Sequence, residues 1–397
     1  MLSVEEAAKT VSSRIQRLPV EKVSLHAARG RILAENIVAS RYLPSFDNSA
    51  MDGFAARAAE LPATLQVVAK IAAGQMLSDP LPERVAVRIM TGAPVPQGLD
   101  TVVIQEDAKV EGGKVTLPAA PVGDNIRRAG EDIAAGEIAV RAGERLDAAE
   151  LGLLAALGIT DVPVARAPRV AIIATGDELV SAGTEPGPSQ IIDSSAHALA
   201  ALIPGCGGVP NYIGIAKDDP GTMAALIASA MNHDVVITTG GVSVGDRDHV
   251  RAALRAAGVE LELWKVAMKP GKPFSFGVNG ARNVPVFGLP GNPVSTFVAF
   301  ELFVRPALLA MQGAAVTNRP RAPVRLSRGY RKQAGRTHYL RAKIVRNGEH
   351  LVANPHPKQG SAMLSSLVGC NGLVELPADA TEILPNTVVP AILLDAV

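Results

Sequence analysis

Four carboxylate residues stand in loops next to apolar segments, where they could hold a divalent cation. They are Glu178 in the segment 174–179, Asp218, and the pair Asp246 and Asp248 beside a glycine-rich turn. Mg²⁺ prefers carboxylate oxygens as ligands and usually bridges them to phosphate groups. Each acid alone could equally cap a helix, which is an ordinary role for Asp in a loop. As a group, the four acids predict a Mg²⁺ site.

Two loops have the composition of anion-binding turns between a strand and a helix. The first, 239–246, contains three glycines, and the second, 289–295, reads Leu-Pro-Gly-Asn-Pro-Val-Ser. Glycines let backbone N–H groups close around an anion, and a helix N-terminus adds a favourable dipole. An ordinary strand-to-helix turn is the alternative for each loop taken alone. The residues that we expect to contact a ligand are Gly240, Gly241, Ser243, Asn292, Pro293 and Ser295.

Three lysines, Lys265, Lys269 and Lys272, cluster around the segment 268–273, which reads Met-Lys-Pro-Gly-Lys-Pro. A run of charge is usually a solvated face of the protein. Here, however, two prolines restrict the backbone immediately before an expected strand, so the charges have defined positions. Placed ammonium groups predict an anionic substrate.

The elements that position these residues alternate between strands and helices from about residue 169 onward. Continuous apolar runs predict strands buried on both faces, and their alternation with helices predicts a parallel, doubly wound α/β sheet. Such sheets bind ligands at the carboxyl ends of their strands, where the acids and glycine loops lie. The expected strands are 170–174, 234–239, 260–266, 274–278 and 284–288, and the expected helices are 190–203, 247–257, one opening at Asp219-Pro220 and one opening at Asn292.

The rest of the chain is expected to form helical and β-rich regions. Capping-box patterns predict helices over about 3–17 and 147–157. Between them, 102–110 and 114–117 are β-prone runs separated by two glycines, which is a hairpin signal. The C-terminal residues alternate short strands with turns, which predicts a small β-barrel or sandwich. We therefore expect a discontinuous helical scaffold (1–45 and 141–168), an inserted β-rich domain (46–140), an α/β domain (169–315) and a C-terminal β-barrel domain (316–397).

Composition excludes several classes of protein. The chain has 397 residues and a formal net charge of +1, so it has no strong basic field for binding nucleic acid. The N-terminus lacks the pattern of a signal peptide, and charged residues within the apolar stretch 294–311 favour a buried helix over a membrane span. Two distant cysteines and seven scattered histidines indicate no disulfide framework, zinc site or catalytic triad. We expect a cytoplasmic protein of several domains.

Nine segments, in this order along the chain, together resemble the MoeA family, which includes the C-terminal domain of gephyrin. The resemblance covers essentially the whole chain, and several of the segments are long. One position departs from the family pattern, since Phe54 stands where the family often has Tyr. The segments are FDNSAMDGFA (46–55), MTGAPVP (90–96), RRAGEDI (127–133), TGDEL (175–179), TTGGVSVGDRDHV (238–250), KPGKPFSFG (269–277), LPGNPVSTFVAFELFVRP (289–306), RTHYLRAK (336–343) and PKQGSAML (357–364).

The resemblance implies four regions that agree with the division above, including an α/β domain that binds molybdopterin, and it implies an elongated homodimer. Members of the family insert molybdenum from molybdate into adenylylated molybdopterin, with Mg²⁺ as cofactor and release of AMP, so the same activity is expected here. Contacts with other molybdenum-cofactor proteins would suit that role, and contacts with nucleic acid or a membrane are not expected. Two alternatives stay open: a molybdopterin adenylyltransferase, whose fold resembles residues 169–312, and a non-enzymatic scaffold of the gephyrin kind.

The resemblance also implies roles for individual residues. The matching motifs assign the four acids Glu178, Asp218, Asp246 and Asp248 to Mg²⁺ and to cleavage of the adenylate. Molybdate or the pterin phosphate would be held by Lys269, Lys272, Ser295, Arg341 and Ser361. The cleft would be closed from the inserted domain and the adjoining scaffold by Asp52, Thr91 and Asp132. A small domain tethered by two chain crossings can project away from its own α/β domain, so we predict an active site shared between the subunits of a homodimer.

Overall fold

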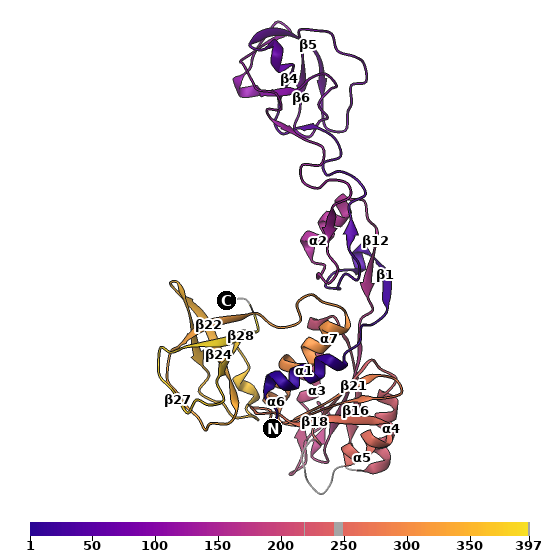
Figure 1. The fold of residues 1–397 in the computed structure, drawn as a ribbon, viewed down its shortest axis with the longest axis vertical. Helices are drawn as coiled ribbons and strands as arrows, with labels where there is room; N and C mark the ends of the chain where they lie inside the picture. Colours follow the sequence, from indigo (N-terminus) through magenta and orange to yellow (C-terminus); the bar gives the residue numbers. More distant parts are fainter. Residues whose placement is uncertain (218, 242–248, 396–397) are drawn as a thin grey trace.

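The computed structural model of the chain describes residues 1–217, 219–241 and 249–395. The molecule is elongated, and its parts follow one another along its length (Figure 1). A six-stranded sheet from the inserted segment lies at one end, and an α/β sheet and a C-terminal barrel lie next to each other at the other end. The short middle part contains β1 (Val20–Ser24), α2 (Ala148–Ala156) and β12 (Asp161–Ala165).

The α/β sheet has six strands, which are in spatial order β16 (Val209–Ala216), β13 (Arg169–Thr175), β17 (Val235–Thr239), β21 (Val284–Leu289), β20 (Pro273–Asn279) and β18 (Val259–Lys265). The first four strands are parallel, which confirms the predicted parallel arrangement for most of the sheet. The other two pair antiparallel. No helix lies between β18, β20 and β21, so short turns reverse the chain direction at this edge.

The helices around this sheet are α1 (Val4–Arg14), α3 (Ser195–Leu202), α4 (Pro220–Ala230), α5 (His249–Ala256), α6 (Pro293–Ala299) and α7 (Arg305–Met311). Val170 and Ile172 of β13 share a hydrophobic core with residues of α1, α3, α6 and α7. Ala171 and Ile173 share a second core with residues of α4 and α5. Successive side chains of a strand point to opposite faces, so the two cores lie on opposite sides of the sheet. The fold is doubly wound, as predicted.

One helix of this region begins later than the sequence pattern predicts. α3 begins at Ser195 rather than at Gln190. The residues in between form β15 (Ile191–Ile192), which pairs in parallel with β14 (Leu179–Val180). The pairing keeps these apolar residues out of the helix and holds them beside the carboxyl end of β13.

The long apolar segment near residue 300 is a continuous helical run made of α6, the π-helical η5 (Phe300–Val304) and α7. The run Pro293–Met311 is long and apolar enough to cross a membrane, but 78% of it is buried within the fold. The predicted buried helix is therefore confirmed. Asn292 is the N-cap and Pro293 takes the first helical position, as predicted, although the Asn292 side chain makes no capping hydrogen bond.

Capping boxes open α1 and α2, as predicted, but the two helices do not pack together as a helical scaffold: α1 packs on the α/β sheet, and α2 packs against β12 in the middle part. In α1, Ser3 N donates to Glu6 Oε2 at 2.7 Å and Glu6 N donates to Ser3 Oγ at 3.1 Å. In α2, Asp147 N donates to Glu150 Oε2 at 2.9 Å. α1 ends at Arg14, about one turn earlier than predicted, since Ile15 is already extended and Leu18 N donates to Met311 O at 2.8 Å instead of continuing the helix.

The inserted sheet contains, in spatial order, β7 (Thr101–Ile104), β4 (Gly53–Ala56), β6 (Val85–Ile89), β5 (Ala63–Ile71), β9 (Lys114–Leu117) and β8 (Lys109–Glu111). The predicted hairpin is β8 and β9, which pair antiparallel across the two glycines. The predicted strand 102–110 is wrong as a single element, because a 3-10 turn over 105–107 separates β7 from β8.

The C-terminal region is a barrel rather than a sandwich. Its strands follow the order β24 (Thr337–Asn347), β25 (His350–Pro355), β22 (Arg321–Leu326), β28 (Val388–Leu393) and β26 (Gly372–Leu376), and β26 also pairs with β24, which closes the ring. β19 (Met268–Lys269), which comes from the α/β region, pairs with β24 from outside the ring. Tyr339, Leu373 and Ile392 of the barrel also belong to the core that contains α1 and α7. The barrel and the α/β region therefore form one packed unit.

A buried ion pair strengthens the junction between these two regions. Glu301, whose side chain is only 1% exposed, accepts from Arg319 at 2.9 Å and 3.1 Å. Arg319 also donates to Leu394 O at 2.8 Å. The guanidinium thus connects the π-helical turn to the last strand of the barrel, and it neutralises a carboxylate that has little access to water.

We predict that Arg319→Met destabilises the protein strongly, because the substitution leaves the Glu301 carboxylate buried without its bidentate partner. Removal of one member of a buried pair typically costs about 3–5 kcal/mol. Chemical denaturation followed by circular dichroism measures the change. Arg331→Met is the control, since Arg331 pairs with Glu382 at 2.8 Å but is 85% exposed, and it should leave the denaturation midpoint nearly unchanged. Equal effects of the two variants would contradict the prediction.

Candidate functional site

The carboxyl ends of the parallel strands border a cavity of about 420 Å³, here called the strand-end cavity. Its walls come from the residues that follow β13, β17 and β21 and from the first residues of α3 and α6. Parallel sheets bind ligands at this edge. The predicted site residues that line it are Glu178, Gly240, Gly241, Asn292 and Pro293.

The turn after β17 requires glycine at two successive positions. Gly240 has φ +84°, and a Cβ atom there would lie 2.6 Å from the carbonyl oxygen of Thr175. Gly241 has φ +64°, and a Cβ atom there would overlap the side chain of Val250. Both the left-handed backbone and the lack of room exclude other residues without rearrangement. The turn thus lies tightly against the end of β13, where Thr175 Oγ1 donates to Thr239 O at 2.9 Å.

The first turn of α3 forms another wall of the strand-end cavity. The buried Asp193 carboxylate accepts from Ala196 N at 3.1 Å and from the Tyr212 hydroxyl at 3.2 Å. Burial, followed by the charge of Asp193, raises the pKa of Tyr212 to about 12, so the hydroxyl stays a donor. Ser195 also lines the cavity, and the exposed side chains of β15 add an apolar surface. This wall was not predicted from the sequence, although Asp-Ser-Ser before a helical pattern is an N-cap signal.

Only one of the four predicted metal ligands lies among the described residues. Glu178 is exposed and lines the strand-end cavity. Lys217, at the end of β16, donates to Asp177 O at 3.1 Å and to Leu179 O at 2.6 Å, so it holds the loop that carries Glu178. The described residues contain no group of three or more His, Cys, Asp or Glu arranged for a metal ion. The other predicted ligands, Asp218, Asp246 and Asp248, lie outside the described residues, as does Ser243.

A second cavity of about 590 Å³, here called the lysine cavity, lies between the α/β region and the barrel. Lys269, Lys272 and Arg336 line it, and they are the only charged residues among the described residues of its wall. Their charges are unbalanced by any acid there, so the cavity favours an anion of more than one charge. Polar groups that can donate or accept hydrogen bonds complete the wall: Asn292, Ser295, Tyr330, Gln359 and Ser361.

The two cavities adjoin at the start of α6. Asn292 lines both of them, with Pro293 on the side of the strand-end cavity and Ser295 on the side of the lysine cavity. Val294 N donates to Ser361 O at 3.2 Å, which ties the barrel to the first turn of α6. A ligand in one cavity can therefore lie next to a ligand in the other, with the helix terminus between them.

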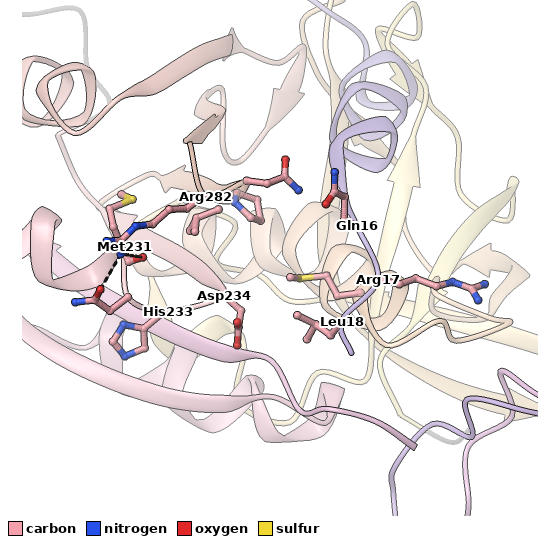
Figure 2. Close-up of a pocket in the computed structure, with 12 residues that line it drawn as sticks. Gln16, Arg17, Leu18, Met231, His233, Asp234 and Arg282 are labelled. Atoms are coloured by element: carbon pink, nitrogen blue, oxygen red, sulfur yellow. Dashed lines mark hydrogen bonds between the residues drawn. The ribbon is translucent and has the colours of Figure 1, made fainter. Parts of the chain in front are cut away.

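A third cavity, of about 360 Å³, lies at the opposite edge of the sheet (Figure 2). It is bordered by His233 and Asp234, which precede β17, and by the start of β21. Arg282 donates to Asn232 Oδ1 at 2.7 Å, and Asp234 is paired with Arg166 at 2.7 Å. The labelled Arg17 side chain extends away from these groups. Arg282 and Asp234 are therefore engaged with the protein, and the cavity lies away from the predicted residues.

Comparisons with known proteins match the chain along its length. Family models match residues 2–158 (MoeA N-terminal region, domain I and II), 171–310 (probable molybdopterin binding domain) and 323–394 (MoeA C-terminal region, domain IV). The molybdopterin molybdenumtransferase of Haemophilus influenzae is 36% identical over 387 residues, which cover 95% of this chain and 94% of that protein. Molybdopterin molybdenumtransferase 2 of Mycobacterium tuberculosis is 37% identical, with 98% of each chain covered. The chain belongs to the MoeA family.

The similarity extends to three-dimensional structure. A crystal structure of the molybdopterin biosynthesis MoeA protein from Pyrococcus horikoshii superposes with a TM-score of 0.86 at 31% identity and covers 99% of this chain and 100% of that one. The predicted fold class, a multi-domain α/β protein with an inserted β-rich region and a barrel, is thereby confirmed. Membership of this family of transferases places the chain in molybdenum cofactor biosynthesis.

Three residues that the MoeA resemblance assigns to the cleft lie far from both cavities within this chain. Asp52 and Thr91 belong to the inserted sheet, at the opposite end of the molecule from the α/β sheet (Figure 1), and Asp132 lies in the chain crossing that leads back from it. Asp52 Oδ1 accepts from Thr91 N and from Thr91 Oγ1, each at 2.7 Å. Both bonds lower the pKa of Asp52, and the bond from Thr91 N has the larger effect. The carboxylate is therefore held ionised on the surface of the inserted sheet.

Two further predicted residues, Lys265 and Arg341, line neither cavity. Lys265 is exposed at the end of β18 and is absent from the described walls of both cavities. Arg341 is buried in β24 and likewise lines neither cavity. Arg336, in the same sequence segment, does line the lysine cavity, although the motif match predicted Arg341 for that role.

His338 lies behind the lysine cavity, opposite Lys269 in the pairing of β19 with β24. It is 3% exposed, and its Nε2 atom has no hydrogen-bond partner among the described residues. Burial, followed by the charges of Lys269, Lys332 and Arg336, lowers the pKa of His338 to about 4. The imidazole is therefore neutral at pH 7, which avoids a further charge beside the cation cluster.

We predict that His338 makes the protein less stable as the pH falls from about 6.5 to about 4. In this window the unfolded chain binds a proton at His338, whose ordinary pKa is 6.5, and the folded chain does not. Protonation therefore favours unfolding below pH 6.5. His338→Gln should flatten this part of the stability profile, measured as unfolding midpoints between pH 4 and 7. Identical profiles of wild type and variant would refute the assignment.

Proposed function

We propose that the chain transfers molybdenum from molybdate to adenylylated molybdopterin, with Mg²⁺ as cofactor and with release of AMP. The observation that carries this proposal is the contact between the two cavities at Asn292. The strand-end cavity lies beside a glycine turn and the starts of two helices, and the lysine cavity is lined by three cations. Membership of the MoeA family supports the same substrate class.

The lysine cavity suits molybdate, a compact dianion. Lys269, Lys272 and Arg336 supply the positive charge, and Ser295 and Ser361 supply hydroxyl groups. A hydrogen bond to a charged group typically contributes about 1.5–3 kcal/mol. The strand-end cavity suits the pterin nucleotide, since a glycine turn and the N-terminus of α3 border it and both favour phosphate oxygens.

Mg²⁺ fits the chemistry of the proposed donor set, which consists of carboxylates alone. Glu178 lines the strand-end cavity, and Lys217 fixes its loop. Asp218, Asp246 and Asp248 complete the proposed set from the segments that follow β16 and β17 in the sequence. When bound, the ion would stabilise negative charge at the phosphoryl group from which AMP leaves.

We propose that the active enzyme is a homodimer in which the inserted domain of one subunit closes the cavities of the other. Asp52 and Thr91 adjoin β4 and β6, which lie at the far end of the molecule from both cavities, and Asp132 lies in the chain crossing that leads back from the inserted sheet (Figure 1). A two-fold dimer presents each inserted domain to the partner in the same way. Cytoplasmic location, and contacts with other molybdenum-cofactor proteins, are parts of the same proposal.

The test of the function is a reaction of the purified protein with adenylylated molybdopterin, Mg²⁺ and molybdate. We expect AMP and molybdenum cofactor to form in equal amounts, and both to disappear without Mg²⁺. Asp246→Ala and Asp248→Ala should abolish AMP release and leave a folded dimer. Absence of AMP release by the wild-type protein would exclude the proposed reaction, and wild-type turnover of both variants would remove these acids from the site.

We predict that Lys272→Ala and Arg336→Ala each raise the KM for molybdate by about 10- to 150-fold, which corresponds to the loss of one charge-assisted contact of roughly 1.5–3 kcal/mol. The dissociation constant of the pterin nucleotide should change much less, because the two residues line the lysine cavity alone. Lys343→Ala is the control, since it removes an exposed charge from β24. An unchanged molybdate KM in both variants would place molybdate elsewhere.

We predict that mixed dimers reveal the shared site. Suppose that Asp52→Ala and Asp246→Ala each inactivate the homodimer. A heterodimer isolated with two different affinity tags would then contain one cleft with both defects and one intact cleft. It should recover about half of the wild-type activity, because two-fold symmetry gives two equivalent sites. If each site lies within one chain, every cleft carries a defect and the heterodimer stays inactive.

A further inference from the structure

The environment of Arg341 distinguishes it from the cations of the lysine cavity. Its side chain is 1% exposed, whereas Lys269 and Lys272 are exposed. Nε donates to Ser366 Oγ at 3.0 Å, and Nη2 donates to Lys358 O at 3.2 Å and to Gly360 O at 3.0 Å. The guanidinium is thus bonded to the segment that follows β25 rather than directed at the cavity.

The same segment is bonded to the backbone of Arg341. Arg341 N donates to Gln359 Oε1 at 3.2 Å, and Gln359 Nε2 donates to Arg341 O at 2.9 Å and to His356 O at 2.8 Å. His356 N also donates to Arg341 O at 2.8 Å. The loop 356–361 is therefore wrapped around one residue of β24, and both its main chain and its Gln359 side chain are engaged.

This loop forms the barrel side of the lysine cavity. Gln359, Gly360 and Ser361 line the cavity, and Ser361 O accepts from Val294 N at 3.2 Å in the first turn of α6. A shift of the loop would move Ser361 and would also free an N–H group of the helix start between the two cavities. The shape of the cavity therefore depends on the contacts of Arg341.

We propose that Arg341 is a positioning residue, which holds the loop 356–361 against α6 so that Ser361 lines the oxyanion site. The proposal rests on the proposed function, because it takes molybdate as the occupant of the lysine cavity. It gives Arg341 a role different from direct contact with the anion, which the family resemblance suggested. The planar guanidinium suits the role, since it can bond a hydroxyl and two carbonyl oxygens at once in a fixed geometry that an ammonium group cannot reproduce.

Three variants test the proposal: Arg341→Lys, Ser366→Ala and the double variant. Ser366 is fully buried and does not line the cavity, but it accepts from Arg341 Nε. We expect faster amide hydrogen exchange in 356–362 for each single variant. The KM for molybdate should rise by roughly tenfold in Arg341→Lys and by less in Ser366→Ala. The kcat of each variant should stay within about twofold of wild type. The double variant should raise the KM by much less than the product of the single effects, because both changes break one network. Lys343→Ala should leave exchange and KM unchanged.

The outcomes separate this proposal from the proposed function. Two results would indicate direct contact between Arg341 and molybdate and would overturn the positioning role. In the first, Ser366→Ala leaves the KM for molybdate and the loop exchange at wild-type values. In the second, the effects of Arg341→Lys and Ser366→Ala on this KM multiply in the double variant. If the wild-type protein does not form molybdenum cofactor, the function fails, and the exchange measurement still decides whether Arg341 and Ser366 hold the loop.

Discussion

The pairing of β19 with β24 is the interaction on which the site depends. Met268 and Lys269 lie opposite Thr337 and His338 in this short parallel pairing. It joins a loop of the α/β region to a barrel strand, while the barrel strands otherwise form their own closed ring. Since Lys269 and Arg336 come from opposite sides of this seam, the cation cluster exists only when the two regions are joined. The shared hydrophobic core and the buried Glu301–Arg319 pair stabilise the same junction.

The elements that carry the site residues at the sheet edge could be predicted from the sequence, because each of them has a local signal. Apolar runs mark the buried strands, glycines mark the turn after β17, and Asn292-Pro293 marks the start of α6. Contacts between distant segments have no such signal. Arg336 and Arg341 lie five positions apart in one strand segment, and only the fold shows that the first lines the cavity and the second is bonded to the loop 356–361. β15 was missed for a related reason, since its partner β14 is needed to keep two isoleucines out of the following helix.

Two chain crossings, around residues 43–47 and 128–132, hold the inserted domain away from its own α/β region. Asp47 Oδ2 accepts from Arg128 Nη1 at 2.6 Å, and Asp47 Oδ1 accepts from Ala129 N at 2.8 Å. These bonds join the outgoing and returning chain crossings, and Asp132 N adds a bond to Leu43 O at 3.1 Å. Two crossings bonded to each other resist bending more than separate linkers would. The carboxylate of Asp52 is thereby held at a defined distance from its own chain's cavities, as the proposed site shared between subunits would require.

The charges of the lysine cavity would couple the binding of an anion to the stability of the fold. Three cations line the cavity without an acid among the described residues of its wall, and a neutral His338 and a buried Arg341 lie behind them. Like charges held together raise the free energy of the folded chain, and exposure of the lysines to water reduces this cost without removing it. A bound dianion would reduce the repulsion, and its binding would stabilise the folded state increasingly as its concentration rises above its Kd. Neutral His338 fits the same requirement, because a protonated imidazole would increase the excess of positive charge over one dianion.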